Sequence, residues 1–216
     1  DKVISPLPNG EELLEKDYRD YSYSEFLSLI HQFSEFSANL EETYNQVGAE
    51  QGFDVDTLYN LDYPDLIFNI HNELTGNTNN HIFTYRDHHG LLAPTNDPNE
   101  SFLNEYLSNW DDLESLPTNI KKIIVNSHMA ERAIYTDDLN YGFLNGERDS
   151  VRLNDGNIIQ KTYGSNCSFL GLNEMIVPRV IKSICRPMYI TRQYQTMMYA
   201  FEQTKVMSAL KKPNVN

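Results

Sequence analysis

Apolar residues spaced three and four positions apart set the dominant pattern of this chain. Between residues 24 and 48 they fall on one face of a long amphipathic helix, which Ser24 would cap. Pro64 and Pro98 suit the first turns of two later helices. The same spacing recurs over 54–76, 97–110, 116–139, 172–185 and 187–212. The pattern therefore predicts a chain built mainly from helices.

Two segments show the period of two that is typical of β-strands. The sequence HIFTYR at 81–86 alternates and is rich in aromatic and β-branched residues, which predicts a strand. Between 141 and 164, an Asn-Gly pair at 145–146 and an Asp-Gly pair at 155–156 separate short alternating segments. Each pair favours the tight turn of a two-residue hairpin. Together they predict a three-stranded antiparallel meander.

The expected fold class is mainly α (α+β): amphipathic helices packed as a bundle, with a small three-stranded antiparallel β-meander inserted at about 141–164. Residues 1–10 contain two prolines and an Asn-Gly pair, which predicts an extended arm. Residues 11–115 would form a mainly helical half with one strand near 81–86. Residues 116–216 would add a helix, the meander and two C-terminal helices. A chain of 216 residues suits one compact domain.

The net charge of the chain changes sign at the boundary between residues 115 and 116. Residues 1–115 hold 23 Asp or Glu against 4 Lys or Arg, and residues 116–216 hold 8 against 13, for a net charge of −14. Opposite charges on two parts of one chain favour docking of those parts, within a molecule or between copies. A solvated acidic face balanced by scattered basic residues accounts for the same counts equally well.

No segment of the sequence predicts contact with a membrane. No apolar run approaches the roughly 20 residues that a membrane span needs, and no secretory signal segment is visible. The two cysteines, Cys167 and Cys185, cannot form a disulfide framework, so we expect reduced and largely buried thiols. The expected location is a reducing intracellular compartment or a virion.

The sequence RDHHG at 86–90 is the first candidate for reactive chemistry. A zinc site needs three or four converging ligands, but His88 and His89 are neighbours and would point to opposite faces of a strand. Asp87 and Gly90 are residues typical of a turn. The segment is therefore interpreted as a surface turn that ends a strand.

Two other motifs could carry chemistry. His128 and Glu131 would share one face of a helix, as in carboxylate-bridged metal bundles, but the sequence shows no second copy of the motif. A partly exposed polar stripe is the preferred interpretation. Residues 163–171 place Ser165 and Cys167 near glycines without forming a nucleophile elbow, so this segment is expected to be a loop with a semi-buried cysteine.

Nucleic acid is a further possible partner for the C-terminal part. Residues 157–216 contain 8 Lys or Arg against 2 Glu, with tyrosines between them, which could hold phosphates and stack on bases. The basic residues are spread out, however, and the acidic half would repel a polyanion. Protein partners are therefore favoured over nucleic acid.

Four short segments in the first half resemble the immunity proteins that inhibit nuclease-type colicins. The segments are DYSYSEFLSLI, NELT, HIFTYR and DPNESFLNEYLSNW, at 20–30, 72–75, 81–86 and 97–110. The resemblance implies a small acidic helical bundle, which would inhibit a nuclease through 24–48 and 54–75. The chain departs from that family in the longer gap between the first two segments and in Thr84, where the family has a tyrosine. Residues 111–216 have no counterpart in it.

The leading hypothesis is a non-catalytic structural or assembly protein that acts through protein–protein contacts. A connector, neck or tail protein of a tailed-phage virion is the specific expectation, with other protein subunits as partners, a homo-oligomer or larger assembly, and no cofactor or metal. The alternatives are an acidic inhibitor of a nuclease, immunity-protein-like or DNA-mimicking, and a hydrolase or metal enzyme that uses His88 and His89. The residues expected at protein contacts are Glu35, Glu41, Glu42, Tyr44, Asn145, Arg148, Arg152 and Asp155.

Overall fold

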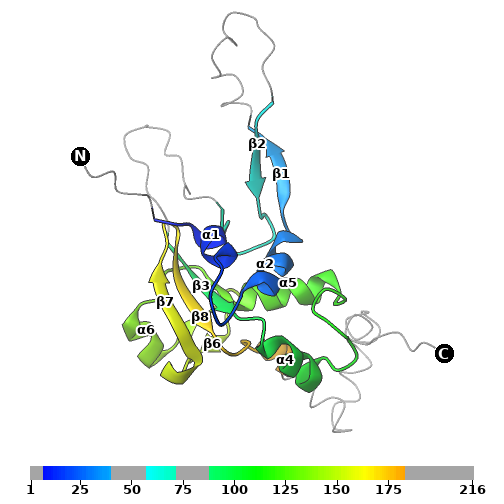
Figure 1. Ribbon diagram of the computed structural model, residues 1–216, viewed down its shortest axis with the longest axis vertical. Helices are drawn as coiled ribbons and strands as arrows, with labels where there is room; N and C mark the ends of the chain where they lie inside the picture. The colour runs from blue at the N-terminus through cyan, green and yellow to red at the C-terminus, as the bar shows by residue number, and fades with distance from the viewer. Residues whose placement is uncertain (1–6, 40–56, 72–87, 183–216) are drawn as a thin grey trace, which may run out of the picture.

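The computed structural model describes residues 7–39, 57–71 and 88–182, which fold into helices packed around three sheets (Figure 1). The helices are α1 (Gly10–Glu15), α2 (Ser24–His31), α4 (Pro98–Tyr106), α5 (Thr118–Ser127) and α6 (Thr136–Tyr141). The central sheet has the strand order β4 (Met129–Ala130), β3 (His89–Pro94), β8 (Cys167–Leu172) and β7 (Ile158–Tyr163). The two small sheets are β1 (Glu35–Ala38) with β2 (Tyr59–Asp62), and β5 (Phe143–Leu144) with β6 (Ser150–Val151). The fold is therefore α+β, and the predicted helical bundle with a three-stranded meander is wrong.

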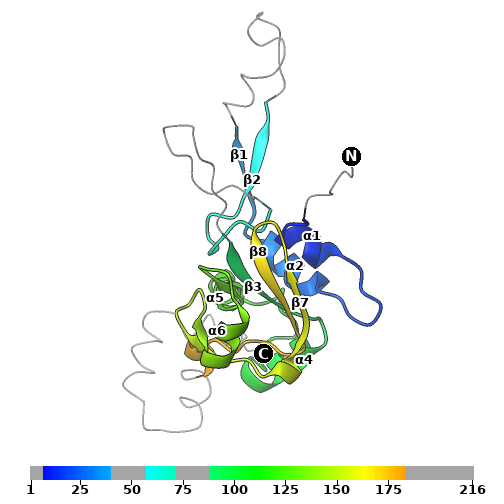
Figure 2. The same ribbon diagram turned by 90° about the vertical axis from the view of Figure 1, so that its left-hand side faces the viewer.

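The core is organised by β3 and β8, which run parallel at the centre of the four-stranded sheet. Leu91 and Phe169 belong to the apolar cluster that includes α2 and α5, whereas Leu92 and Leu170 pack with α6, β5 and β6. Helices α1 and α2 lie on one side of the sheet and α6 on the other (Figure 2). A strand covered on both faces needs a continuous apolar run instead of alternation. The predicted loop at 163–171 is wrong for this reason, since all six residues of β8 are buried.

The predicted helix over 24–48 is wrong over 32–39, and its residues 40–48 lie outside the described ranges. Helix α2 buries Phe26, Leu29 and Ile30, and the chain then turns into β1 at Glu35. Phe33, three residues after Ile30, is still buried at 6% exposure, but Phe36, the following residue of the stripe, is 73% exposed. Helices in proteins are stabilised mainly by packing of their apolar face. Apolar spacing without a core to pack against is therefore not enough to continue α2.

The predicted helix over 54–76 is also wrong in its described part. Residues 59–62 form β2, which pairs antiparallel with β1, and residues 64–71 form turns and bends without a helix. By contrast, the prediction of a helix over 97–110 is confirmed over 98–106 by α4, which carries Pro98 at its first position, whereas residues 107–110 lie beyond its end.

The predicted helix over 116–139 divides into α5, β4 and α6. Helix α5 ends at Ser127 because the next residues hydrogen-bond elsewhere: the Leu92 amide donates to the His128 carbonyl at 2.8 Å, and Met129 pairs with Leu91 of β3. The buried His128 side chain holds this junction. Its Nδ1 donates to the Ile124 carbonyl at 2.8 Å, and its Nε2 accepts from the Ile176 amide at 2.9 Å.

The predicted three-stranded meander at 141–164 is wrong. Strands β5 and β6 form a hairpin, but residues 145–149 connect them in place of the predicted two-residue turn, and Gly146 lacks the positive φ of such a turn. Asp155–Asn157 forms a single 3-10 turn in place of a second hairpin. The strand after it, β7, pairs antiparallel with β8 and not with β6. The buried apolar surface of β8 therefore outweighs the local turn preference of the Asp-Gly pair.

Several predictions concern residues outside the described ranges. They are the strand at 81–86, the helix at 187–212, the thiol of Cys185 and the first six residues of the arm. The predicted helix at 172–185 is only partly described, and residues 173–178 within it form no helix. Residues 8–10 of the predicted arm lie against the body, because the Ser165 amide donates to the Pro8 carbonyl at 2.8 Å.

Gly171 is a site where packing leaves no room for a side chain. The fully buried Tyr23 ring lies against it, and a Cβ at position 171 would come 2.0 Å from the Tyr23 hydroxyl oxygen. The Gly171→Ala variant should therefore lose about 1–3 kcal/mol of unfolding free energy in denaturant titrations. Gly156→Ala is the matched control, since no atom lies within 4 Å of a Cβ there. Equal losses in the two variants would contradict this account of the packing.

His128 should make stability depend on pH. Burial lowers the pKa of its imidazole to about 4 from an ordinary 6.5. Between these values the unfolded chain binds a proton here and the native chain does not, so the free energy of unfolding should fall by about 3 kcal/mol as the pH drops from 6.5 to 4. His128→Gln should flatten the slope over this range, whereas His88→Gln, at an exposed position, should keep it. Equal slopes in the two variants would refute the assignment.

Candidate functional site

The histidine pair of RDHHG does not end a strand as predicted. His89 opens β3, and its ring stacks on Phe68 with 4.6 Å between ring centroids and 8° between planes. Gly90 lies inside the same strand, where a Cβ would come 2.6 Å from the Ile134 side chain. His88 lies just before the strand and is exposed. The two rings are therefore not brought to a common site.

Two other side chains that could carry chemistry serve the core. Burial raises the pKa of the Cys167 thiol to about 12, so it stays protonated and unreactive at neutral pH. Both ring nitrogens of His128 are hydrogen-bonded, as described above. Among the described residues, no group of three or more His, Cys, Asp or Glu could hold a metal ion. The described residues also form two surface features that could bind a partner.

The antiparallel pair of β1 and β2, called the ribbon from here on, projects from one end of the molecule (Figures 1 and 2). Its register pairs Phe36 with Leu61 and Ala38 with Tyr59, so these four side chains share one face. Glu35, Ser37, Asn60 and Asp62 share the opposite face. The ribbon therefore has one apolar face and one polar face.

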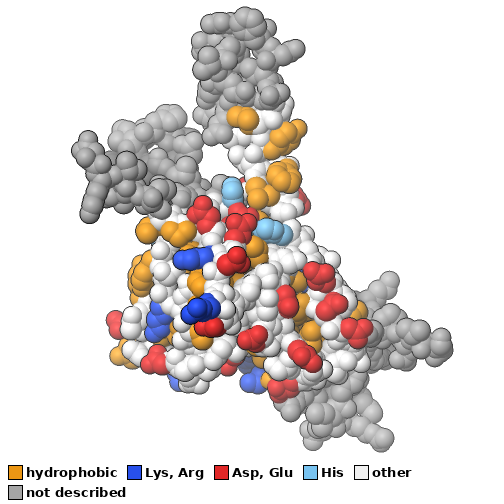
Figure 3. Space-filling model, in the orientation of Figure 1, with side chains coloured by type: hydrophobic (Ala, Val, Ile, Leu, Met, Phe, Trp, Pro, Cys, Tyr) orange, Lys and Arg blue, Asp and Glu red, His pale blue; other side chains and the backbone are white. Residues whose placement is uncertain are grey.

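The apolar face of the ribbon is exposed to solvent, as is most of the polar face. Phe36 is 73% exposed and Tyr59 is 61% exposed, and Figure 3 shows hydrophobic side chains along the projecting ribbon. On the polar face, the Ser37 hydroxyl donates to Asp62 Oδ2 at 2.5 Å. An isolated two-stranded sheet is only marginally stable in water, and exposed apolar strands tend to pair with other chains. The ribbon is thus a candidate protein-binding surface.

Glu11 of α1 fixes the base of the ribbon to the body. One carboxylate oxygen lies 3.1 Å from His31 Nε2, and the other contacts His71 Nδ1. His31 ends α2 shortly before β1, and His71 follows β2, so one side chain holds the segments that enter and leave the ribbon. Only 12% of the Glu11 side chain is exposed. We call these three residues the Glu11 clamp.

Asn166 connects the clamp to the central sheet. It is buried directly before β8, and its side-chain oxygen accepts from the Gly10 amide at 2.9 Å. Its side-chain nitrogen donates to the Ile70 carbonyl at 3.0 Å. Gly10 and Ile70 are the immediate neighbours of Glu11 and His71, so the position of the clamp is set by the start of β8.

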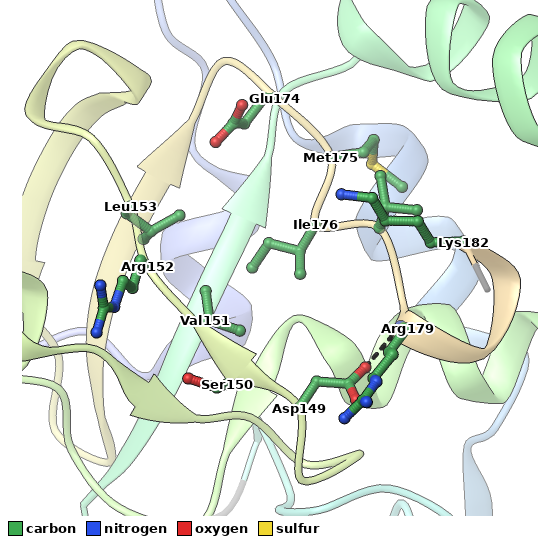
Figure 4. A pocket seen from close by; sticks show the side chains of 11 residues that line it. Asp149, Ser150, Val151, Arg152, Leu153, Glu174, Met175, Ile176, Arg179 and Lys182 are labelled. Atoms are coloured by element: carbon green, nitrogen blue, oxygen red, sulfur yellow. Dashed lines mark hydrogen bonds between the residues drawn. The ribbon is translucent and has the colours of Figure 1, made fainter.

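A pocket with basic residues at its rim lies near the opposite end of the molecule from the ribbon. It has a volume of about 500 Å³ and lies between the β6 region and residues 174–182. Val151 and Ile176 point towards its middle, with Arg152 on one side and Arg179 and Lys182 on the other (Figure 4). The remaining lining residues are Asp149, Ser150, Leu153, Glu174, Met175 and Val177. The pocket thus combines a buried apolar floor with exposed cations, and we call it the basic pocket.

The residues predicted at protein contacts are spread over these features. Glu35 is exposed on the ribbon, and Arg152 lines the basic pocket. Arg148 is exposed with a φ of 59°, and Asp155 is exposed 3.7 Å from the Lys161 amine. Glu41, Glu42 and Tyr44 lie outside the described residues.

Asn145 is buried, unlike the other described candidates. Its side-chain nitrogen donates to the Ser127 carbonyl at 3.0 Å, and its side-chain oxygen accepts from the Asp149 amide at 2.9 Å. It therefore shapes the β5–β6 hairpin and leaves its polar atoms no access to a partner. The sequence analysis missed the apolar face of Phe36 and Tyr59, although the alternation in EFSA and YNLD could have indicated it.

The Glu11→Gln variant tests the clamp. Loss of the charged acceptor should weaken both contacts, by about 1–3 kcal/mol in total, and free the ribbon from the body. Amide hydrogen exchange should then speed up in peptides covering 35–38 and 59–62 but not in β3 or β8. Glu15→Gln, at an exposed position of the same helix, should leave the ribbon unchanged. Unaltered exchange in Glu11→Gln would show that the clamp does not hold the ribbon.

None of the helices in the described ranges is both long and apolar enough to cross a bilayer. No protein-family model, curated protein or solved structure matches this chain. Its function therefore has to be inferred from its own residues.

Proposed function

We propose that this chain is a non-catalytic assembly protein that works by binding other protein subunits. The observation that carries the proposal is the apolar face of the ribbon, where Phe36, Ala38 and Tyr59 are exposed and Leu61 is half-buried against the core. Single exposed apolar residues are ordinary on protein surfaces, but three exposed on one face of a projecting sheet form a flat surface suited to a partner.

The free energy gained by burying the apolar face of the ribbon is not enough by itself for a stable complex. Burying a large apolar side chain stabilises a complex by about 1.5–3 kcal/mol. Phe36 and Tyr59 could therefore act as anchors, because they are rigid, wide side chains with few rotatable bonds. Association also costs several kcal/mol in lost freedom of motion, so two anchors alone would give weak binding. The partner must then contact more than the ribbon.

A subunit of a virion is the specific setting that we propose, such as a connector, neck or tail protein of a tailed phage. A projecting ribbon lets one subunit reach the next in a repeating particle, and uneven charge gives each subunit two different ends. These are general features of assembly proteins, and they support the setting without a motif that is specific to it.

An acidic inhibitor of a basic enzyme is the second candidate. Residues 88–115 contain six Asp or Glu and no Lys or Arg. Figure 3 shows acidic side chains gathered over the part of the surface near α4. Such a surface could take the place of a polyanion on a nuclease. This candidate would use the acidic body and would not need the apolar face of the ribbon.

The double variant Phe36→Ser/Tyr59→Ser tests the leading proposal. The full chain, alone or purified with its natural partners, should sediment as species larger than one 25.0 kDa chain. The double variant should shift towards the single chain, because the apolar anchors are gone. Tyr141→Ser is the matched control, since Tyr141 is 81% exposed on α6 away from the ribbon.

Two outcomes would count against the proposal. A wild-type chain that remains single at every concentration and ionic strength, with no co-purifying subunit, would contradict it. A chain that binds only a basic enzyme, with equal affinity in the wild type and the double variant, would favour the inhibitor.

A further inference from the structure

We propose that the ribbon of one copy docks in the basic pocket of a second copy, so that copies join head to tail. The inference rests on the proposed function, because it names the partner of the ribbon as another copy of this chain. It also assigns a ligand to the basic pocket, namely a β-ribbon with two aromatic side chains on one face and two acidic side chains on the other.

The arrangement of the two surfaces requires a second copy. The ribbon points away from the body at one end, and β6 with residues 174–182 lies towards the other end in both views (Figures 1 and 2). A ribbon therefore cannot reach the pocket of its own chain. Two different surfaces that meet between copies form a heterologous contact, which generates rings or open filaments.

The apolar parts of the two surfaces match. The pocket floor presents Val151, Leu153 and Ile176, which are buried in the single chain but line the cavity. A volume of about 500 Å³ lies within the range of protein ligand sites and has room for aromatic side chains. Phe36 and Tyr59 are the two most exposed side chains of the ribbon's apolar face. Aromatic anchors that enter a pocket of a partner are typical hot spots of protein interfaces.

The charges of the two surfaces are opposite. Glu35 is exposed on the ribbon, and Asp62 lies on the same polar face. The pocket carries three cations, Arg152, Arg179 and Lys182, against Asp149 and Glu174. The Asp149 carboxylate accepts from the Arg179 backbone amide at 2.7 Å, and the lining as a whole keeps a net charge of +1. The ribbon carboxylates would steer the encounter towards this cationic rim.

The wider charge distribution favours the same pairing over a symmetric one. The described residues of 7–71 hold 9 Asp or Glu and 2 Lys or Arg, whereas residues 141–182 hold 4 and 5. A twofold contact of ribbon on ribbon would bring two acidic surfaces together, at a cost in repulsion. A ribbon-to-pocket contact avoids this repulsion, because residues 141–182 carry a net charge of +1.

A mixing experiment separates this pairing from all others. The ribbon variant Phe36→Ser/Tyr59→Ser keeps an intact pocket, and the pocket variant Arg152→Glu/Lys182→Glu keeps an intact ribbon. Each alone should self-associate at least about tenfold more weakly than the wild type. Mixed in equal amounts, they should form a complex of two chains and nothing larger, because only one ribbon and one pocket remain. High salt should weaken wild-type association.

Two controls keep the result interpretable. Lys161→Glu reverses an exposed cation on β7 outside the pocket and should assemble as the wild type does. Carbodiimide cross-linking of a mixture of light and heavy-isotope wild-type chains should join Glu35 of one copy to Lys182 of the other. This second measurement uses the unchanged chain, so a variant that fails to fold does not decide the outcome.

Some results would overturn the inference alone, and others would overturn the proposed function with it. Self-association of the pocket variant at wild-type strength, or a mixture that stays as single chains while the wild type assembles, would refute the head-to-tail contact only. A wild-type chain that is single by itself but binds other subunits through the ribbon would do the same. A chain that binds nothing would refute both.

Discussion

The parallel pairing of β3 with β8 is the constraint on which the rest of the structure depends. These strands lie between two apolar clusters and contribute side chains to both, so disrupting the pair would remove packing contacts from each cluster. The start of β8 also places Asn166, which holds the Gly10 amide and the Ile70 carbonyl. Glu11 is thereby positioned between His31 and His71. The direction of the ribbon thus follows from hydrogen bonds that begin at the central sheet.

The division of the chain into a packed body and a projecting ribbon explains why the surfaces, and not a reactive cleft, carry the functional proposal. In the described body, Cys167 is buried and protonated, and His128 bridges two backbone groups. The ribbon shows the opposite arrangement, since its polar side is hydrogen-bonded and its apolar side faces water. The apolar surface that remains outside the core is available for association.

The sequence predicts those elements whose signals are local. Helix α4 follows from a proline at a helix start, and the Asn-Gly pair lies in the connection of the β5–β6 hairpin, although not as the predicted two-residue turn. It does not predict β8, because a fully buried strand lacks the alternation that identifies strands. It also mistakes Phe33 and Phe36 for a helical stripe, since apolar residues three apart suit a helix until the core ends. For the candidate site, the sequence analysis named the charged residues Glu35 and Arg152. The pairing of β1 with β2 that gathers the apolar side chains on one face depends on the three-dimensional structure, so the sequence alone does not show it.

Side-chain footprinting of the wild-type chain across a range of concentrations tests the central claim most directly. Hydroxyl radicals label exposed aromatic rings, and Phe36, Tyr59 and Tyr141 are all exposed in the single chain. If the ribbon's apolar face is an assembly surface, labelling of Phe36 and Tyr59 should fall as assemblies form, while labelling of Tyr141 stays constant. Assemblies in which Phe36 and Tyr59 remain as reactive as Tyr141 would contradict the account.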